Sequence, residues 1–256
     1  MNKICALIQA RTGARRLANK VLLPLKGKTV LEHVINRVRA ARSVDEAVVV
    51  TTVSKEDLKI VELVSHLGVR VLCGSEEDVL DRYYQAARLL NVSHVARITA
   101  DCPVMDPAVI DQVVDAYFTG KADYCSNALT PTFPDGLDVE VFSFEALKKA
   151  WQNARLASER EHVTPYIRRH KRQFKIVSLE NPGRLGHYRW TLDEKKDYEF
   201  LLKIYDGLYR ANPLFGMEDI LRFLKGKPEL SRINAAITRN EGYARSLKND
   251  KVTSHG

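Results

Sequence analysis

The sequence has few cysteines and lacks the cysteine pairs of zinc and redox motifs. Its 256 residues include four, Cys5, Cys73, Cys102 and Cys125, and none belongs to a C-x-x-C pair. Their apolar neighbours predict reduced thiols in or near buried strands. The sequence also lacks an uncharged run of the ~20 residues that a membrane helix needs.

Targeting and nucleotide-binding signatures are missing as well. Residues 1–3 lead directly into a strand-like run, without the apolar segment and cleavage site of a signal peptide, so we expect a cytoplasmic protein. Neither a Walker A loop nor a G-x-G-x-x-G fingerprint occurs. The composition, with 45% hydrophobic and 28% charged residues, is that of a globular protein. A net charge of +8 is compatible with nucleotides, nucleic acid or lipid headgroups and selects none of them.

The first half of the chain alternates short apolar runs with helical patterns. We expect strands at 4–9, 46–53, 69–73 and 94–99, and helices at 30–41, 54–68, 76–90 and 107–120. This alternation predicts an α/β fold with a mostly parallel, doubly wound sheet and helices on both faces. Ser54 and Asp57 come close to a capping box, and Asp106 before Pro107 is a second helix cap.

The second half is less regular. We expect strands at 137–142, 174–179 and 189–192, and helices at 144–155, 159–170, 194–210 and 217–224. No repeat or low-complexity linker divides the chain, so residues 1–225 are expected to form one domain. Residues 226–256 are a basic extension with few large apolar side chains, and its stretch 245–256 is expected to be loose.

The connection after the first strand is the most informative segment. It contains a glycine and the four cations Arg11, Arg15, Arg16 and Lys20, but no acid. In a doubly wound sheet, ligands bind beyond the carboxyl ends of the strands, where this loop lies. Because four like charges repel one another unless an anion joins them, we favour a triphosphate site over a solvated basic loop.

Two aspartates directly follow predicted strands and fall at the same edge of the sheet. Asp101 comes after the strand at 94–99, and Asp193 comes after the strand at 189–192. Their carboxylate oxygens suit a Mg²⁺ ion that is also bound to phosphate oxygens. A structural role is open for each: a turn cap for Asp101 and the N-cap of the next helix for Asp193.

Further polar residues point to a second substrate. Asp138 and Glu140 share one face of a predicted strand, where they can bind a ligand or simply face solvent. His162 and Tyr166 are four residues apart on a predicted helix and so share a face. Together with Arg189, they can meet a carboxylate, phosphate or phosphonate.

Taken in order, these segments resemble a known family. They read IQARTGARRLANKVLLPLKGKTVLEHVINRV, GSEEDVLDRYYQAA, RITADCPVMDP, PDGLDVEVF, SEREHVTPYI and WTLDEKKDYEF. The chain is similar, over about residues 1–225, to the cytidylyltransferases that make CMP-activated sugar acids, of the CMP-Kdo and CMP-sialate synthetase type. The branch of spore-coat polysaccharide biosynthesis protein F resembles it most.

The resemblance implies a Rossmann-like nucleotidyltransferase domain over residues 1–225, commonly dimeric. It implies a Mg²⁺ cofactor on Asp101 and Asp193. The implied nucleotide-binding residues are Ala10, Arg11, Gly13, Arg16, Lys20, Ser75 and Asp78. The implied catalytic residues are Arg11, Lys20, Asp101 and Asp193.

The first loop departs from the usual Ser-Thr-Arg-Leu-Pro-Gly-Lys of this branch. Ala14 replaces the serine, Arg15 adds a charge, and Ala18 and Asn19 replace the proline and glycine that bend the loop. Because asparagine tolerates positive φ better than most residues, Asn19 is expected to preserve the bend.

The reaction implied by the resemblance is transfer of CMP from CTP to an acidic acceptor, with release of pyrophosphate. The acceptor would be a sugar acid or similar compound for surface polysaccharide or glycan biosynthesis. The expected partners are CTP, this acceptor and a second copy of the chain, without nucleic acid or membrane. The loop alone leaves open a transferase that uses another nucleotide on a sugar phosphate. The net charge and the basic tail leave open a non-catalytic nucleotide- or RNA-binding protein.

Overall fold

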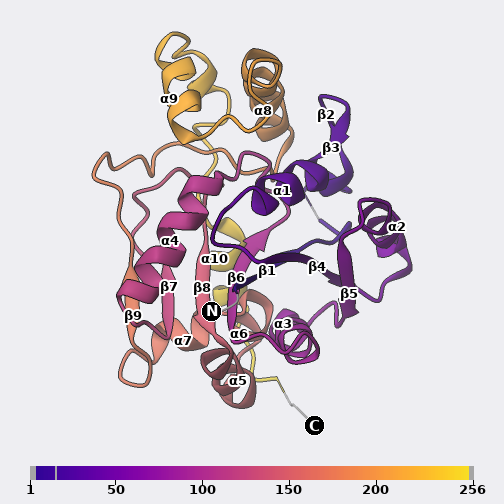
Figure 1. Ribbon diagram of the computed structural model, residues 1–256, viewed down its shortest axis with the longest axis vertical. Coiled ribbons are helices and arrows are strands. Elements are labelled where there is room, and N and C mark those ends of the chain that lie inside the picture. The colour runs from indigo at the N-terminus through magenta and orange to yellow at the C-terminus, as the bar shows by residue number, and fades with distance from the viewer. Residues whose placement is uncertain (1–3, 15, 254–256) are drawn as a thin grey trace.

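The computed structural model describes residues 4–14 and 16–253. Within these residues, the main sheet has seven strands in the order β5-β4-β1-β6-β8-β7-β9 (Figure 1). The strands are β1 (Ile4–Gln9), β4 (Glu46–Thr52), β5 (Arg70–Gly74), β6 (His94–Thr99), β7 (Tyr124–Ser126), β8 (Glu140–Ser143) and β9 (Ile176–Ser178). A separate hairpin consists of β2 (Pro24–Leu25) and β3 (Lys28–Thr29).

Helices cover both faces of the sheet. The helices are α1 (Val30–Arg39), α2 (Leu58–His66), α3 (Val79–Leu89), α4 (Pro107–Thr119), α5 (Phe144–Asn153), α6 (Ala157–His162), α7 (Pro165–Arg169), α8 (Lys195–Leu208), α9 (Met217–Lys225) and α10 (Glu241–Lys248). Short 3₁₀ turns are η1 (Lys20–Leu22), η2 (Lys55–Asp57) and η3 (Leu230–Arg232). Buried apolar residues of α1, α2, α4, α8 and α9 belong to one hydrophobic core, and those of α3, α5 and α7 belong to the other.

Strand β1 explains why the fold is doubly wound. All residues from Ile4 to Ile8 are buried, and the side chains at even positions enter one core while those at odd positions enter the other. β1 pairs in parallel with β4 and β6, so the carboxyl ends of these three strands meet at one edge. The predicted α/β fold with a mostly parallel, doubly wound sheet is therefore confirmed.

The structure differs from the prediction around β8. This strand runs antiparallel to both β6 and β7, and it begins at Glu140 rather than at residue 137. The apolar pattern did not reveal β7. The segment 189–192, predicted as a strand, forms only an isolated bridge between Arg189 and Asp135. Its backbone is hydrogen-bonded to loops rather than to a strand; for example, Leu192 N donates to Asp101 O at 2.8 Å.

The predicted helix at 159–170 is split into α6 and α7. Val163 between them has φ of +71°, and Pro165 has no backbone N–H to continue the hydrogen-bond ladder. His162 and Tyr166 therefore lie on different helices and do not share a face. This part of the sequence prediction is wrong, because the left-handed conformation of a valine is not visible in a hydrophobic pattern.

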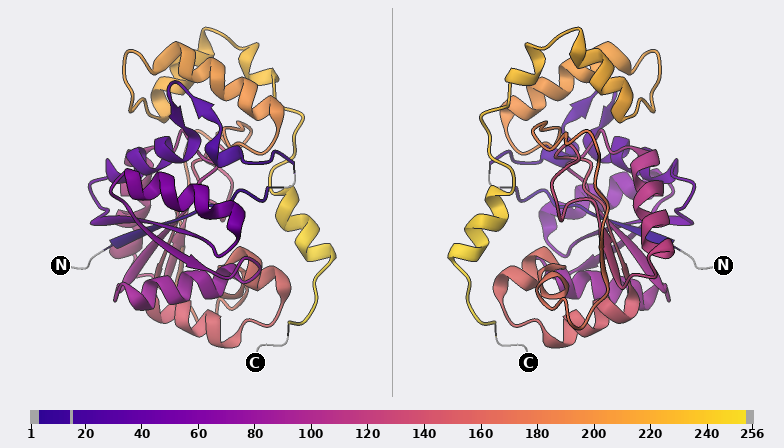
Figure 2. Two further views of the ribbon diagram at one scale, coloured as in Figure 1. Left: turned by 90° about the vertical axis from the view of Figure 1, so that its right-hand side faces the viewer. Right: turned by 90° about the vertical axis from the view of Figure 1, so that its left-hand side faces the viewer.

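The C-terminal extension lies along one side of the molecule. Figure 2 shows it in yellow, running from the end that carries α9 to the end that carries α5–α7. Residues 245–248, expected to be loose, belong to α10. Among the described residues, no helix has the length and hydrophobicity needed to cross a membrane. Cys5, Cys102 and Cys125 are buried as predicted, whereas Cys73 is exposed; all four are free thiols.

Candidate active site

A cleft of about 1020 Å³ lies at the edge where β1 and β6 end. Its walls come from the loop after β1, the segment before α3, helix α6, Asp193 and helix α10. All the predicted nucleotide-binding and metal-binding residues line this cleft: Ala10, Arg11, Gly13, Arg16, Lys20, Ser75, Asp78, Asp101 and Asp193. Arg15, the remaining cation of the loop, lies outside the described residues.

Thr12 holds the first loop in shape. Its backbone N–H donates to Asp57 Oδ1 at 2.7 Å, and its hydroxyl donates to the same oxygen at 2.6 Å. Its carbonyl accepts from Ala14 N at 2.8 Å and from Asn19 N at 3.1 Å. As predicted, Asn19 preserves the bend, with φ of +55°. The next residue, Lys20, is thereby directed into the cleft.

Asp57 is a buried residue that bonds to the first loop, although the sequence prediction assigned it to helix capping. Its carboxylate accepts hydrogen bonds from Thr12 and from the Thr52 hydroxyl. Asp57 is at the N-cap position of α2, but its side chain makes no cap hydrogen bond to that helix. Burial raises the pKa of Asp57, but the hydrogen bonds from Thr12 and Thr52 outweigh it and hold the pKa below its usual value. The signal that could have identified Asp57 is its position soon after a buried strand, as for Asp101.

Lys20 lies between the two aspartates of the sheet edge. Its Nζ donates to Asp101 Oδ2 at 2.6 Å and to Asp193 Oδ1 at 2.7 Å. Burial raises the pKa of Asp101, but the Lys20 ammonium outweighs it and lowers the pKa to about 2. Burial likewise lowers the pKa of Lys20, and the two carboxylates more than reverse the effect. Asp101 and Lys20 are therefore both charged at neutral pH.

Asp193 is not the helix cap that one interpretation predicted. The N-cap of α8 is Glu194, and the carboxylate of Asp197 accepts the backbone N–H groups of Asp193 and Glu194, each at 2.9 Å. The Asp193 side chain is thus available to the cleft, where it bonds to Lys20 and, at 3.1 Å, to Arg16. Asp106 does cap α4, as predicted, through a 2.8 Å bond from Ala108 N.

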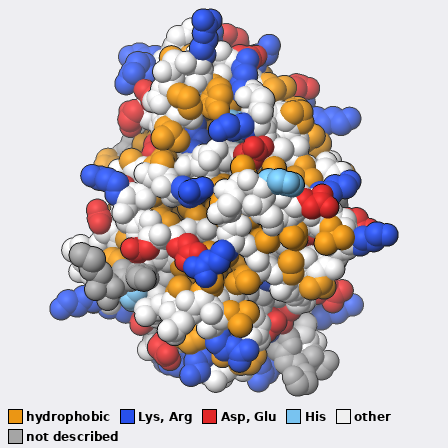
Figure 3. Space-filling model, turned by 45° about the vertical axis from the view of Figure 1, so that its right-hand side comes forward, with side chains coloured by type: hydrophobic (Ala, Val, Ile, Leu, Met, Phe, Trp, Pro, Cys, Tyr) orange, Lys and Arg blue, Asp and Glu red, His pale blue; other side chains and the backbone are white. Residues whose placement is uncertain are grey.

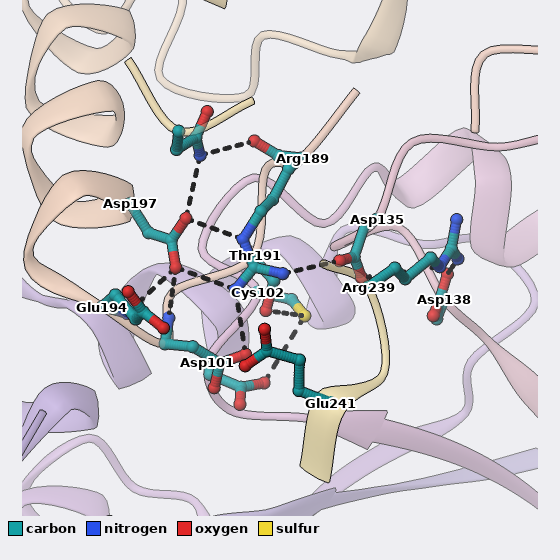
Figure 4. A network of polar contacts seen from close by, with 12 residues as sticks. Asp101, Cys102, Asp135, Asp138, Arg189, Thr191, Glu194, Asp197, Arg239 and Glu241 are labelled. Atoms are coloured by element: carbon teal, nitrogen blue, oxygen red, sulfur yellow. Dashed lines mark hydrogen bonds and ion pairs between the residues drawn. The ribbon is translucent and has the colours of Figure 1, made fainter. Parts of the chain in front are cut away.

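Arg189 supports Asp193 from behind the cleft. Figure 4 shows its guanidinium between Asp135 and Asp197, at 3.1 and 2.8 Å. It also donates to Asp193 Oδ2 at 3.1 Å. Asn234, from the C-terminal extension, donates to Asp197 Oδ1 at 2.9 Å and to the Arg189 carbonyl at 3.0 Å. Arg189 was predicted to bind the acceptor, but among the described residues it is not part of the cleft wall. It lies instead behind Asp193, a predicted metal ligand.

The predicted acceptor residues are not brought together. His162 lines the cleft, but among the described residues Asp138, Glu140 and Tyr166 do not. Glu140 is buried and accepts bonds from Arg97, Tyr124 and Thr164. Asp138 pairs with Arg239, and the Tyr166 ring stacks on His170 with ring centroids 4.0 Å apart.

The wall beside α3 has its own set of fixed polar groups. Ser75 Oγ accepts the N–H of Asp78 at 3.0 Å, and Asp78 caps α3. Arg160 of α6 donates to Asp78 Oδ2 at 2.9 Å, and Arg82 donates to the Ser75 carbonyl at 2.9 Å. Arg82 and Arg160 are cleft residues that the sequence prediction missed, because neither stands in a recognisable motif.

The two carboxylates of the sheet edge fit a magnesium ion that is also bound by substrate phosphates. Within the described part of the chain, no three His, Cys, Asp or Glu side chains gather as a metal site. Asp101 and Asp193 nevertheless converge on one ammonium group, so they can also converge on one cation. Mg²⁺ is typically held by one or two carboxylates together with substrate phosphates, which is what this pair offers.

Comparison with known proteins places the chain in a family. The family model described as cytidylyltransferase matches residues 5–218. The chain is 40% identical over 243 residues to an uncharacterized protein of Methanocaldococcus jannaschii, covering 94% of this chain and 98% of that one. It is 35% identical over 243 residues to the spore coat polysaccharide biosynthesis protein SpsF of Bacillus subtilis, covering 90% and 97%.

A solved structure agrees with these relatives. The structure of a cytidylyltransferase from Leptospira borgpetersenii is 32% identical, covers 93% of this chain and 99% of that chain, and superposes with a TM-score of 0.86. The predicted Rossmann-like nucleotidyltransferase fold is thereby confirmed. The chain therefore belongs to the cytidylyltransferase family.

Proposed function

We propose that the protein transfers CMP from CTP to a small acidic acceptor, a sugar acid or a similar compound, with Mg²⁺ as cofactor. The observation that carries this proposal is the convergence of Asp101, Asp193 and Lys20 beside the basic loop after β1. Carboxylates and cations within one cleft suit a metal–triphosphate better than a nucleic acid backbone. On the face seen in Figure 3, basic and acidic side chains are interspersed rather than gathered into one basic patch.

The reaction needs no protein nucleophile. An oxygen of the acceptor attacks the α-phosphorus of CTP, a new P–O bond forms, and the bond to the leaving pyrophosphate breaks. Negative charge increases on the α-phosphate and on pyrophosphate. Lys20 is held at the sheet edge by its bonds to Asp101 and Asp193, where its ammonium would stabilise this charge.

Arg11 and Arg16 complete the phosphate site in two ways. Within the described residues, the Arg11 guanidinium has no hydrogen bond or ion pair and is free to bind an anion. Arg16 pairs with Asp193, Glu194 and Glu241 on the cleft surface, at 3.1, 3.3 and 3.2 Å. Because exposed ion pairs are worth at most about 1 kcal/mol, phosphate oxygens can replace these partners.

Asp101 and Asp193 would hold the magnesium ion. When bound, the ion supplies positive charge at the phosphate oxygens and orients them for in-line displacement. Arg189 and the Asp197 carboxylate hold Asp193 in place for this role. We also propose, from the family resemblance, a homodimer, and from the sequence, a cytoplasmic location; light scattering and cell fractionation test these two points.

A nucleotide screen tests the donor. We expect CTP with Mg²⁺ to raise the melting temperature more than UTP, GTP or ATP, because stabilisation increases with the ratio of ligand concentration to Kd. Pyrophosphate release from CTP is then measured across keto-sugar acids, phosphonates and carboxylated amines. A response to GTP alone would favour the alternative of another nucleotide on a sugar phosphate. A response to no nucleotide would contradict the proposed enzyme.

Replacement of Asp193 tests the metal assignment. Asp193→Asn is expected to lower turnover by about 100-fold or more and to raise the Mg²⁺ concentration needed for half-maximal activity. Asp206→Asn is the matched control, because Asp206 is an exposed acid on α8 that pairs with Lys26. Unchanged Mg²⁺ dependence in Asp193→Asn would show that this carboxylate does not bind the metal.

A further inference from the structure

The C-terminal extension forms a wall of the cleft, although it lies beyond the residues matched by the family model. Gly242, Arg245 and Ser246 line the cleft from one face of helix α10, and Asn249, which follows the helix, lines it too. Next to them, α6 contributes Ala157, Ser158, Arg160, Glu161 and His162. These two groups of residues are called the α6–α10 wall below.

Specific hydrogen bonds hold the extension against α6. Asp250 accepts from Ser158 N at 2.9 Å and from Ser158 Oγ at 2.7 Å. Thr253 N donates to the Arg155 carbonyl at 2.7 Å. In the middle of the helix, Ser246 Oγ lies 3.0 Å from His162 Nε2. The α6–α10 wall is therefore a built surface, with a defined face of α10 turned to the cleft.

The start of α10 lies near the phosphate side of the cleft. Glu241, its first residue, pairs with Arg16 at 3.2 Å. Arg245 is four residues later, so it shares the face of Glu241 and lies about 6 Å further along the helix axis. This position is about one helical turn beyond the contact between Glu241 and Arg16, on the face of α10 that lines the cleft.

Arg245 carries the unpaired positive charge of this wall. Within the described residues, its guanidinium has no hydrogen bond or ion pair, and the residue is exposed. Arg160 is paired with Asp78. Burial lowers the pKa of His162 to about 4, so its imidazole is neutral at neutral pH. A neutral histidine can donate a hydrogen bond to an anion, but Arg245 has to supply the charge.

We propose that Arg245 binds the anionic group of the acceptor, a carboxylate, phosphate or phosphonate, on the α6–α10 wall. This inference rests on the proposed function, which supplies an acidic acceptor. The triphosphate has its own cations in Arg11, Arg16 and Lys20 at the first loop. The cleft volume of about 1020 Å³ is at the upper end of the ~300–1,000 Å³ that binds one small ligand, which suits two substrates side by side. A guanidinium binds such anions with two parallel hydrogen bonds.

Calorimetry on the full chain tests this proposal without turnover. The protein is first saturated with Mg²⁺ and a CTP analogue whose α,β-bridging oxygen is a methylene, which prevents pyrophosphate release. It is then titrated with 3-deoxy-manno-octulosonate, N-acetylneuraminate and 2-aminoethylphosphonate. Arg245→Gln is compared with Arg245→Lys, which keeps the charge, and with Lys248→Gln. Lys248 is the matched control because it is an exposed cation of α10 that is not in the cleft lining.

We expect at least one acid to bind the saturated wild type. Arg245→Gln should weaken its binding about tenfold or more, Arg245→Lys should restore part of it, and Lys248→Gln should leave it unchanged. The affinity for the CTP analogue should stay the same in every variant. Equal binding of the acid by Arg245→Gln would overturn the proposal. So would an equal loss of affinity for the CTP analogue, because Arg245 would then serve the triphosphate.

Two further results separate this inference from the proposed function. If the analogue binds and none of the acids does, the acceptor subsite is refuted while the nucleotide site stands. If the wild type binds neither CTP nor the analogue, the proposed function itself fails, and this inference fails with it.

Discussion

At the scale of single residues, Asp57 shows how a group outside the cleft lining can control the site. It receives both the N–H and the hydroxyl of Thr12, and Thr12 fixes the loop that carries Arg11 and Lys20. A buried carboxylate with these bonds remains ionised, because its pKa lies below the usual value. Removing it leaves the buried Thr12 N–H without an acceptor, which costs about 1–3 kcal/mol.

We therefore expect Asp57→Ala to weaken CTP binding by about tenfold or more, while Asp57→Asn, which can still accept from Thr12 N, loses less. Calorimetric titration with CTP measures the effect. Glu56→Ala is the control, since Glu56 is the neighbouring acid of η2 and its side chain bonds to Ser54 rather than to the loop after β1. Wild-type CTP affinity in Asp57→Ala would disprove this role.

The ionisation of Asp57 also gives a pH dependence. Because its folded pKa is below the unfolded value, its contribution to the free energy of unfolding is fully present above the unfolded pKa of about 3.8. That contribution is lost as the pH falls toward the folded pKa. Chemical denaturation below pH 5 should therefore show a smaller loss of stability with falling pH in Asp57→Asn than in the wild type.

At the scale of elements, the segment 189–192 is positioned by close backbone packing rather than by a sheet. Trp190 N donates to the Asp135 carbonyl at 2.6 Å. Gly136, which follows Asp135, has φ of +109°. A Cβ at Gly136 would lie 2.6 Å from Thr191 N and 2.7 Å from the Trp190 carbonyl carbon. The segment leads directly to Asp193, so its position also sets the position of that carboxylate.

We expect Gly136→Ala to lower the free energy of unfolding by at least about 2 kcal/mol and to reduce turnover, because the clash moves the backbone that precedes Asp193. Gly27→Ala is a matched control: Gly27 also has a positive φ, of +79°, but its Cβ would meet nothing within 4 Å. That control should lose only the conformational term of about 1–2 kcal/mol. Urea denaturation measures both, and equal losses would argue against the close packing.

At the scale of the whole molecule, the boundary between the domain and its extension falls later than residue 225 in structural terms. Asn234 is buried and bonds to both Asp197 and the Arg189 carbonyl, behind the cleft. Arg239 donates to Asp138 and to the Phe133 carbonyl. Helix α10, in contrast, has no buried residue within its described length. The extension therefore has a part up to Arg239 that bonds to the fold behind the cleft, and a later part that covers the cleft and is bonded to α6 through Asp250.

Two truncations separate these parts. A chain that ends after residue 239 should stay folded and keep its affinity for the CTP analogue, but it should lose affinity for the acceptor acid because helix α10, with Arg245, is gone. A chain that ends after residue 225 should lose about 2 kcal/mol or more of folding free energy, because the buried partners of Asn234 lose their donor. Chemical denaturation and calorimetry measure the two effects. A chain ending after 225 that is as stable as the full chain would contradict this division.

The sequence by itself determined the strands of the first half, the basic loop after β1 and the two aspartates that meet Lys20. Hydrophobic periodicity is local, and parallel strands bring their carboxyl ends to one edge, so these parts follow from neighbouring residues. The tertiary structure alone decided the split at Val163, the bond of Asp57 to Thr12 and the placing of α10 over the cleft. These features depend on contacts between residues far apart in the chain or, at Val163, on a single backbone angle. Such contacts and angles leave no periodic pattern in the sequence.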